Sequence, residues 1–297
     1  MLRSADLAIC HMEIPIGAPG ERPGVYGRSP FGGNLIEAPF EVAAGLRAAG
    51  FDRCSTASNH SYDLGAGGIS STLAALDAAG ITHTGTARSP AESSPAVFEV
   101  NGVRVAHLSY TTYSNTVAPS VPWLMNYTTD PARVAADVDA ARSAGAEVVI
   151  VSVHIAQELL PAPIAADRAF ISEITKASHI DLVIEHGPHV VQPVERVNGT
   201  VVFWSVGNFV SGMGTNQIGR YADPHTLDGL LASVRFTETS PGTFAADATP
   251  VLLCEERANR TVHPVIATLA DPTISPTLRA ELQECLDRST PVVAGLR

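Results

Sequence analysis

The chain has 297 residues, of which 45% are hydrophobic and 16% are charged, and its formal net charge at pH 7 is −11. This length and apolar content allow a large core, in one domain or in two. The negative charge argues against non-specific nucleic-acid binding, which depends on basic patches. No apolar run approaches the ~20 residues of a membrane span, and the first residues lack the layout of a signal peptide.

From residue 5 to about residue 210, the sequence alternates between predicted strands and helices. Residues 7–10 form a short apolar strand, and a loop rich in Gly and Pro follows over residues 17–34. A helix is predicted from Pro39 to Gly50, then a strand over residues 54–57 and an amphipathic helix that ends at Gly80. This alternation indicates βαβ units with right-handed crossovers.

Two Asn-Gly pairs predict β-hairpins within this pattern, one at Asn101-Gly102 and the other at Asn198-Gly199. Further helices are predicted around residues 134–141 and 164–177, and the apolar runs 149–153 and 181–184 after them are typical of buried strands of a parallel sheet. After about residue 225 the pattern changes to β-hairpins (230–236 and 245–253) and a final helix near 276–288.

The predicted fold class is therefore α/β, with mostly parallel sheets flanked by helices. Residues 1–225 are expected to form the core, and residues 226–297 to complete the same domain with hairpins and a helix. The four cysteines show neither CxxC spacing nor a compact framework, which favours buried free thiols over ligands or disulfides. The sequence leaves the oligomeric state open.

Histidines stand directly after both of the buried runs. His154 ends the first run, and His186 and His189 follow the second around the turn Gly187-Pro188. In open α/β sheets, ligands bind outside the carboxyl ends of the strands. The glycine allows close backbone approach and the proline stiffens the turn, which fixes the separation of the two imidazoles. Taken alone, His154 is more simply a histidine whose hydrogen bonds are satisfied at a strand end. The pair His186 and His189 fits metal ligation and a purely structural role equally well.

Asn59-His60 has the same position relative to its own strand. The Asn59 amide oxygen can coordinate a metal, and His60 can transfer a proton. Asp63 either orients His60 or caps the helix that begins near Gly65, and the sequence favours the cap. Glu13 supplies a carboxylate at the end of the first strand, two residues after His11.

These segments together resemble the CapA family of capsule-synthesis proteins, the poly-γ-glutamate branch of the calcineurin-like metallophosphatase fold. The resemblance rests on ADLAICHME (5–13), SNHSYDLG (58–65), VSVH (151–154) with Glu158, EHGPHVVQPVE (185–195) and SVGNF (205–209), which occur in the family's order. No single segment is specific, but the combination is, and it covers roughly residues 5–211.

The resemblance implies a calcineurin-like αββα sandwich with a divalent metal centre, often binuclear, at the strand ends. The metal can be Mn, Zn, Fe, Mg or Ca. His60 falls where related phosphoesterases place the acid that protonates the leaving group, with Asp63 and His11 as further catalytic candidates. The family pattern puts the metal ligands at Glu13, Asn59, His154, His186 and His189, and we expect substrate-binding positions at Glu158, Glu195 and Asn208.

The chain departs from the family pattern at three places. The family opens with a strand that ends in Gly-Asp, whose aspartate is a metal ligand, and this sequence begins after that point. Ile155-Ala156 stands where the family usually has Trp-Gly, and Glu185 stands where it usually has glycine. These changes leave room for a single, harder metal such as calcium.

Three functions follow as hypotheses. The first is a metal-dependent hydrolase that acts on a glutamate polymer or a related envelope peptide. The second is a metal-dependent peptide epimerase, which needs a base on one face of a Cα and an acid on the other. The third is a non-catalytic component of polymer binding or capsule assembly. The expected location is the cytoplasm for this sequence alone, and the cell envelope or exterior if a signal or anchor precedes it.

Overall fold

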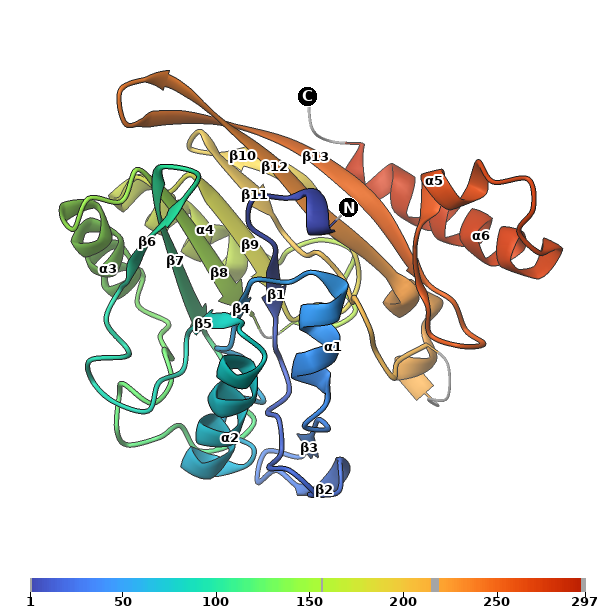
Figure 1. The fold of residues 1–297 in the computed structure, drawn as a ribbon, viewed down its shortest axis with the longest axis horizontal. Coiled ribbons are helices and arrows are strands. Elements are labelled where there is room, and N and C mark those ends of the chain that lie inside the picture. The colour runs from blue at the N-terminus through green and yellow to red at the C-terminus, as the bar shows by residue number, and fades with distance from the viewer. Residues whose placement is uncertain (1, 156, 215–218, 295–297) are drawn as a thin grey trace. The chain divides into compact units, whose positions relative to one another are not determined.

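The computed structural model describes residues 2–155, 157–214 and 219–294 (Figure 1). Ala156, the second residue of one departure from the family pattern, lies outside the described residues. The chain forms two compact units. Unit 1 comprises Met1–Ala156 and Ala177–Ile180, and unit 2 comprises Gln157–Lys176 and Asp181–Arg297. The boundary expected near residue 225 stays a prediction.

Unit 1 contains a parallel sheet of three short strands in the order β1-β4-β5. These strands are β1 (Ile9–His11), β4 (Arg53–Ser55) and β5 (Thr82–Thr84). Helix α1 (Val42–Ala49) lies in the chain between β1 and β4, and α2 (Gly65–Ala78) lies between β4 and β5. The predicted helices and βαβ order are confirmed.

A two-stranded hairpin occupies the segment for which a loop was expected. Strands β2 (Gly24–Arg28) and β3 (Asn34–Glu37) pair antiparallel within and just beyond residues 17–34, so this expectation was wrong. Four of the five β2 residues are exposed, including Val25 and Tyr26. A strand with little burial on either face has no hydrophobic alternation by which a sequence pattern reveals it.

The second group of strands in unit 1 consists of β6 (Val97–Val100), β7 (Val103–Thr111) and β8 (Val148–His154). β6 and β7 form the predicted antiparallel hairpin, whose turn residues Asn101 and Gly102 have φ angles of 50° and 84°. β7 and β8 are parallel, and α3 (Pro131–Ser143) lies between them in the chain. All seven residues of β8 are buried, which explains its continuous apolar run.

In unit 2, β9 (Leu182–His186) pairs parallel with β11 (Thr200–Phe203), and β10 (Val194–Val197) pairs antiparallel with β11. The turn between β10 and β11 is the second predicted hairpin, with φ angles of 51° at Asn198 and 91° at Gly199. Helix α4 (Ala165–Ala177) precedes β9. The two Asn-Gly predictions are therefore both confirmed.

The rest of unit 2 is an antiparallel sheet with two helices. Strands β12 (Asp228–Ser240) and β13 (Thr243–Glu255) form the long hairpin drawn in orange in Figure 1, and β14 (Val262–Pro264) pairs with β13. Helices α5 (Val265–Leu269) and α6 (Pro276–Val293) both contact β13. Three short 3₁₀ turns complete the described elements: Leu2–Ser4, Gly219–Ala222 and Pro224–Leu227. The structure confirms the predicted mixed α/β class with mostly parallel sheets.

The cysteines form two disulfides, so the expectation of four free thiols was wrong. Cys10 and Cys54 are register partners on the parallel strands β1 and β4, with their Cα atoms 4.4 Å apart. Cys254 of β13 is joined to Cys285 of α6, with a Cα separation of 6.1 Å. Both separations lie in the range that a disulfide bridges. Each pair is distant in sequence, and only the tertiary fold brings its members together.

No helix in the described part of the chain is long and apolar enough to cross a membrane.

Candidate metal centre

In unit 1, His11 and His154 meet at the carboxyl ends of β1 and β8. His11 Nε2 lies 3.0 Å from His154 Nδ1, and the two rings are stacked with their centroids 5.1 Å apart. His154 is 2% exposed, because the strand before it is buried. The structure thus joins two candidate residues that are 143 positions apart in the sequence.

Hydrogen bonds on both nitrogens of His11 restrain this pair of rings. The Ser55 hydroxyl lies 2.8 Å from His11 Nδ1 and 3.4 Å from the Cys10 carbonyl oxygen. His11 Nε2 faces Nδ1 of His154. A metal-binding histidine uses one ring nitrogen for a supporting hydrogen bond of this kind. Because Nδ1 of His154 is engaged with His11, Nε2 is its candidate metal-binding nitrogen.

The loop after β4 places Asn59 in the interior of unit 1, where it is 4% exposed. Its Nδ2 donates to Asn115 Oδ1 at 3.3 Å, and its Oδ1 has no hydrogen-bond partner among the described residues. A buried polar atom without a partner costs free energy, and it is rare in native proteins. An amide oxygen left open in this way is suited to bind a metal ion.

His60 forms a close pair with Asp63. His60 Nδ1 lies 2.6 Å from Asp63 Oδ2, which also accepts from the Ile36 backbone N–H at 2.9 Å. The N-cap of α2 is Leu64, and it makes no side-chain cap hydrogen bond. The expectation that Asp63 caps this helix was therefore wrong. Asp63 orients His60 instead.

Two further contacts hold the backbone of Glu13 and of His154. The Ser58 hydroxyl donates to the Glu13 carbonyl, and the backbone N–H of Thr112 donates to the His154 carbonyl at 3.0 Å. Asn115, three residues after Thr112, was not identified from the sequence. Its only sequence signal is its place in the polar loop that follows the buried strand β7.

In unit 2, the turn after β9 carries His186 and His189. Gly187 has a φ angle of 110°, which glycine adopts readily, and His189 has a φ of 61°, which is uncommon for a residue with a Cβ. His189 Nδ1 lies 2.9 Å from Asn208 Oδ1, while Asn208 Nδ2 donates to the Thr226 carbonyl at 2.9 Å. Because the Asn208 oxygen accepts, His189 carries its proton on Nδ1, and Nε2 is the nitrogen with the lone pair.

The two residues that end β9 have strongly perturbed ionisation. Burial lowers the pKa of His186 to about 3, so its imidazole is neutral, as a metal ligand must be. Burial also raises the pKa of the fully buried Glu185 well above its usual range, and the nearby Asp167 raises it further. Neither carboxyl oxygen of Glu185 has a hydrogen-bond partner among the described residues.

The remaining candidates lie elsewhere in unit 2. Glu195 accepts hydrogen bonds from Arg168 at 2.8 and 3.2 Å and from Trp204 Nε1 at 2.8 Å, and the Arg168 guanidinium stacks on the Trp204 ring at 4.8 Å. The bond from Arg168 holds the pKa of Glu195 below its usual range. These contacts favour a structural role for Glu195. Glu158 accepts from the Tyr221 hydroxyl at 3.1 Å.

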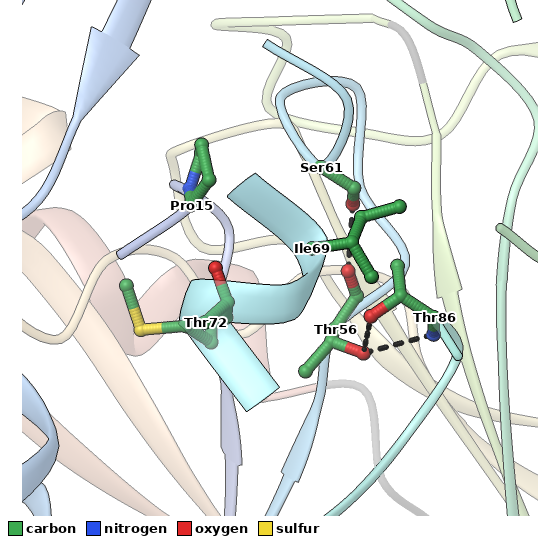
Figure 2. A pocket seen from close by; sticks show the side chains of 7 residues that line it. Pro15, Thr56, Ser61, Ile69, Thr72 and Thr86 are labelled. Carbon is green, nitrogen blue, oxygen red and sulfur yellow. Dashed lines mark hydrogen bonds between the residues drawn. The ribbon is translucent and has the colours of Figure 1, made fainter. Parts of the chain in front are cut away.

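A small cavity in unit 1, shown in Figure 2, lies beside α2 and has a volume of about 10 Å³. That volume suffices for about one water molecule. Figure 2 shows a hydrogen bond between the hydroxyls of Thr56 and Thr86, and one from the Ser61 hydroxyl to the Thr56 carbonyl. The cavity is too small for a substrate; its lining residues are Met12, Pro15, Thr56, Ser61, Ile69, Thr72 and Thr86.

Residues 1–213 match the family described as bacterial capsule synthesis protein PGA_cap. The chain is 29% identical over 211 residues to the PGA biosynthesis protein CapA of Bacillus subtilis, covering 69% of this chain and 52% of that protein. It is 26% identical over 225 residues to the capsule biosynthesis protein CapA of Bacillus anthracis, covering 74% and 52%. The chain therefore spans about half the length of the curated relatives it matches.

Among solved structures, the calcineurin-like phosphoesterase YfkN from Bacillus subtilis aligns with a TM-score of 0.47 and 13% identity, over 84% of this chain and 74% of that chain. The sulfate thiohydrolase SoxB of Thermus thermophilus aligns with a TM-score of 0.47 and 15% identity, over 83% and 39%. These alignments cover most of this chain at low sequence identity, so the family assignment depends on the sequence matches.

Proposed function

The chain belongs to the family of bacterial capsule synthesis proteins PGA_cap, and from this premise we propose that it is a metal-dependent enzyme with hydrolase-type chemistry. The proposed substrate is poly-γ-glutamate or a related peptide of the cell envelope. The observation that carries the proposal is the state of His154 and His189, which each have Nδ1 held by a hydrogen bond. This arrangement is typical of metal-binding histidines.

The candidate metal ligands within unit 1 are Glu13, Asn59 and His154, and those within unit 2 are His186 and His189. The buried, unpartnered oxygen of Asn59 supports this assignment, as does the neutral imidazole of His186. Each unit offers imidazole ligands, which favour a transition metal such as Mn, Fe or Zn over Mg or Ca.

When bound, such a metal activates a water molecule or polarises the bond to be cleaved. The protein's own contribution to proton transfer is the pair of His60 and Asp63. Asp63 Oδ2 lies 2.6 Å from Nδ1 of His60, which holds the ring in place. We therefore assign His60 as the proton donor to the leaving group. His11, which contacts His154, supports a ligand instead of reacting with substrate itself.

The test measures bound metal and polymer cleavage together. Purified protein is expected to retain a divalent metal by mass spectrometry and to shorten poly-γ-glutamate chains. His154→Ala and His189→Ala are expected to lose both the metal and the activity. The matched control is His225→Ala, since His225 is an exposed histidine paired with Asp223 at 2.7 Å. Full metal occupancy in both variants would contradict the assignment.

The same assay distinguishes the alternative functions. If the protein incorporates deuterium at Cα without shortening the chain, it is an epimerase, because epimerisation removes a Cα proton and leaves the peptide bond intact. If the metal-loaded protein binds the polymer but does neither, it is a binding or assembly component. Glu158 and Asn208 remain candidates for substrate contact.

The two disulfides support a proposal about location. Disulfides persist in oxidising compartments and are rare in the bacterial cytosol. We propose that the protein acts in the cell envelope or outside the cell, where Cys10–Cys54 and Cys254–Cys285 stay oxidised. Protein isolated from its native host is then expected to show no thiol that an alkylating reagent labels. Labelling of all four cysteines would contradict this location.

A further inference from the structure

Asn115 contacts both functional residues of the loop after β4. Its Oδ1 accepts from Asn59 Nδ2 at 3.3 Å, and its Nδ2 lies 3.2 Å from each ring nitrogen of His60. The side chain is 4% exposed, so water does not replace these contacts. One buried amide therefore uses its oxygen on a candidate ligand and its nitrogen on the candidate proton donor.

The backbone of Asn115 is fixed from two sides. Its N–H donates to the Asn59 carbonyl at 2.9 Å, and its carbonyl accepts from the Ser29 hydroxyl in the turn between β2 and β3. Three residues earlier, Thr112 donates to the His154 carbonyl. Asn115 thus lies between the β2–β3 hairpin, the loop that carries Asn59 and the end of β8, all within unit 1.

Hydrogen-bond chemistry couples the orientations of the two amides. If the Asn59 amide turned over, its oxygen would face the oxygen of Asn115, and two acceptors would oppose each other. If the Asn115 amide turned over, its nitrogen would face Asn59 Nδ2, and two donors would oppose each other. The observed arrangement is the one in which Asn59 Nδ2 is occupied and Asn59 Oδ1 is left without a partner among the described residues.

The ring of His60 is restrained by two residues. Asp63 Oδ2 lies 2.6 Å from Nδ1. Asn115 Nδ2 lies 3.2 Å from both ring nitrogens, so it contacts the ring without selecting either nitrogen. Asp63 and Asn115 together restrain the orientation of the imidazole.

We propose that Asn115 is a positioning residue that turns the Asn59 oxygen toward the metal and holds the ring of His60. This inference rests on the proposed function, because it takes Asn59 as a ligand. Residues that support a metal ligand in this way typically contribute a factor of 10–100 to metal affinity.

The experiment measures Mn²⁺ binding to the metal-stripped full chain by titration calorimetry. Asn115→Leu removes both polar atoms at similar volume and is expected to raise the Mn²⁺ dissociation constant by about 10-fold or more. Asn115→Asp keeps an oxygen opposite Asn59 Nδ2 and is expected to bind Mn²⁺ at least as tightly as wild type. The control is Thr116→Val, whose side chain contacts Ser114 and not the amide pair.

A double variant separates positioning from general disruption. If Asn115 acts through Asn59, then Asn59→Ala with Asn115→Leu binds Mn²⁺ no more weakly than Asn59→Ala alone. In the metal-free protein at fixed pH, the ¹H–¹⁵N signals of the His60 ring are expected to shift in Asn115→Leu and to stay unchanged in Thr116→Val.

Each outcome bears on one of the two proposals. Wild-type affinity in Asn115→Leu, with an unchanged His60 spectrum, overturns the role of Asn115 and leaves the proposed function intact. Additive losses in the double variant also overturn it. Absence of Mn²⁺ binding in every variant and in wild type overturns the proposed function, and the positioning role with it.

Discussion

Replacing Glu185 with methionine is expected to stabilise the protein. Glu185 lies on β9 with 0% exposure, and neither of its carboxyl oxygens has a hydrogen-bond partner among the described residues. A buried polar group without a partner costs about 1–3 kcal/mol. Methionine has a similar length, is flexible enough to fill the space and carries no group that needs a partner.

The magnitude follows from the size of the chain. Unfolding entropies near 2.1 cal/mol/K per residue give a chain of 297 residues about 0.6 kcal/mol per kelvin. A gain of about 1–3 kcal/mol therefore raises the melting temperature by about 2–5 °C. Scanning calorimetry on metal-stripped protein measures this shift without the contribution of metal binding.

The stabilisation is expected to depend on pH. The folded-state pKa of Glu185 is raised above its value in the unfolded chain, mainly by burial. The native wild-type protein therefore holds a proton that the unfolded chain releases, and it loses stability as the pH rises from the unfolded pKa toward the folded one. The advantage of Glu185→Met is thus smallest near pH 4 and grows as the pH rises through this window.

The control for this experiment is Glu99→Met, which changes an exposed glutamate of β6. Exposed substitutions of this kind usually stay within about 0.5 kcal/mol of wild type. A lower melting temperature for Glu185→Met at neutral pH would refute the reasoning. A shift that is equal at acidic and neutral pH would show that the carboxyl of Glu185 ionises normally.

Two further predictions concern stability. Replacing both Cys254 and Cys285 with serine removes a cross-link between positions 31 residues apart, and the chain-entropy model gives a loss of about 3–4 kcal/mol, measurable by urea unfolding without reductant. An unchanged midpoint would show that the two thiols are not joined. Gly207→Ala places a Cβ 2.4 Å from the Asp228 carbonyl oxygen at a φ of 63°, whereas Gly199→Ala meets no atom within 4 Å at a φ of 91°. Both variants incur the left-handed backbone strain of about 1–2 kcal/mol, so a larger loss of melting temperature is expected for Gly207→Ala, and equal losses would contradict the close contact.

The sequence determined the local structure of the chain well. Continuous apolar runs revealed β8 and β9 because buried parallel strands need apolar side chains on both faces. The pairs Asn101-Gly102 and Asn198-Gly199 revealed their hairpins because tight turns require positive φ at both central positions. The exposed hairpin of β2 and β3 was missed because it has no such pattern.

The candidate residues were also identified from the sequence, because a histidine or amide that follows a buried apolar run lies at the carboxyl end of a strand. Their hydrogen-bond partners were not. Asp63 stands three residues after His60 and just before α2, so its position fits both pairing with His60 and helix capping. Asn115 has no recognisable spacing to Asn59, and the cysteine pairs have none to each other.

The difference has a physical cause. Strand, helix and turn preferences arise from side chains and backbone angles within a few residues, so the sequence alone determined them here. Three features depend on neighbours 31 to 143 positions away: the nitrogen of His154 that faces His11, the atom of the Asn59 amide that has no partner among the described residues, and the pairing of the cysteines. Only the folded chain brings those neighbours within bonding distance, and so only the tertiary structure decided them.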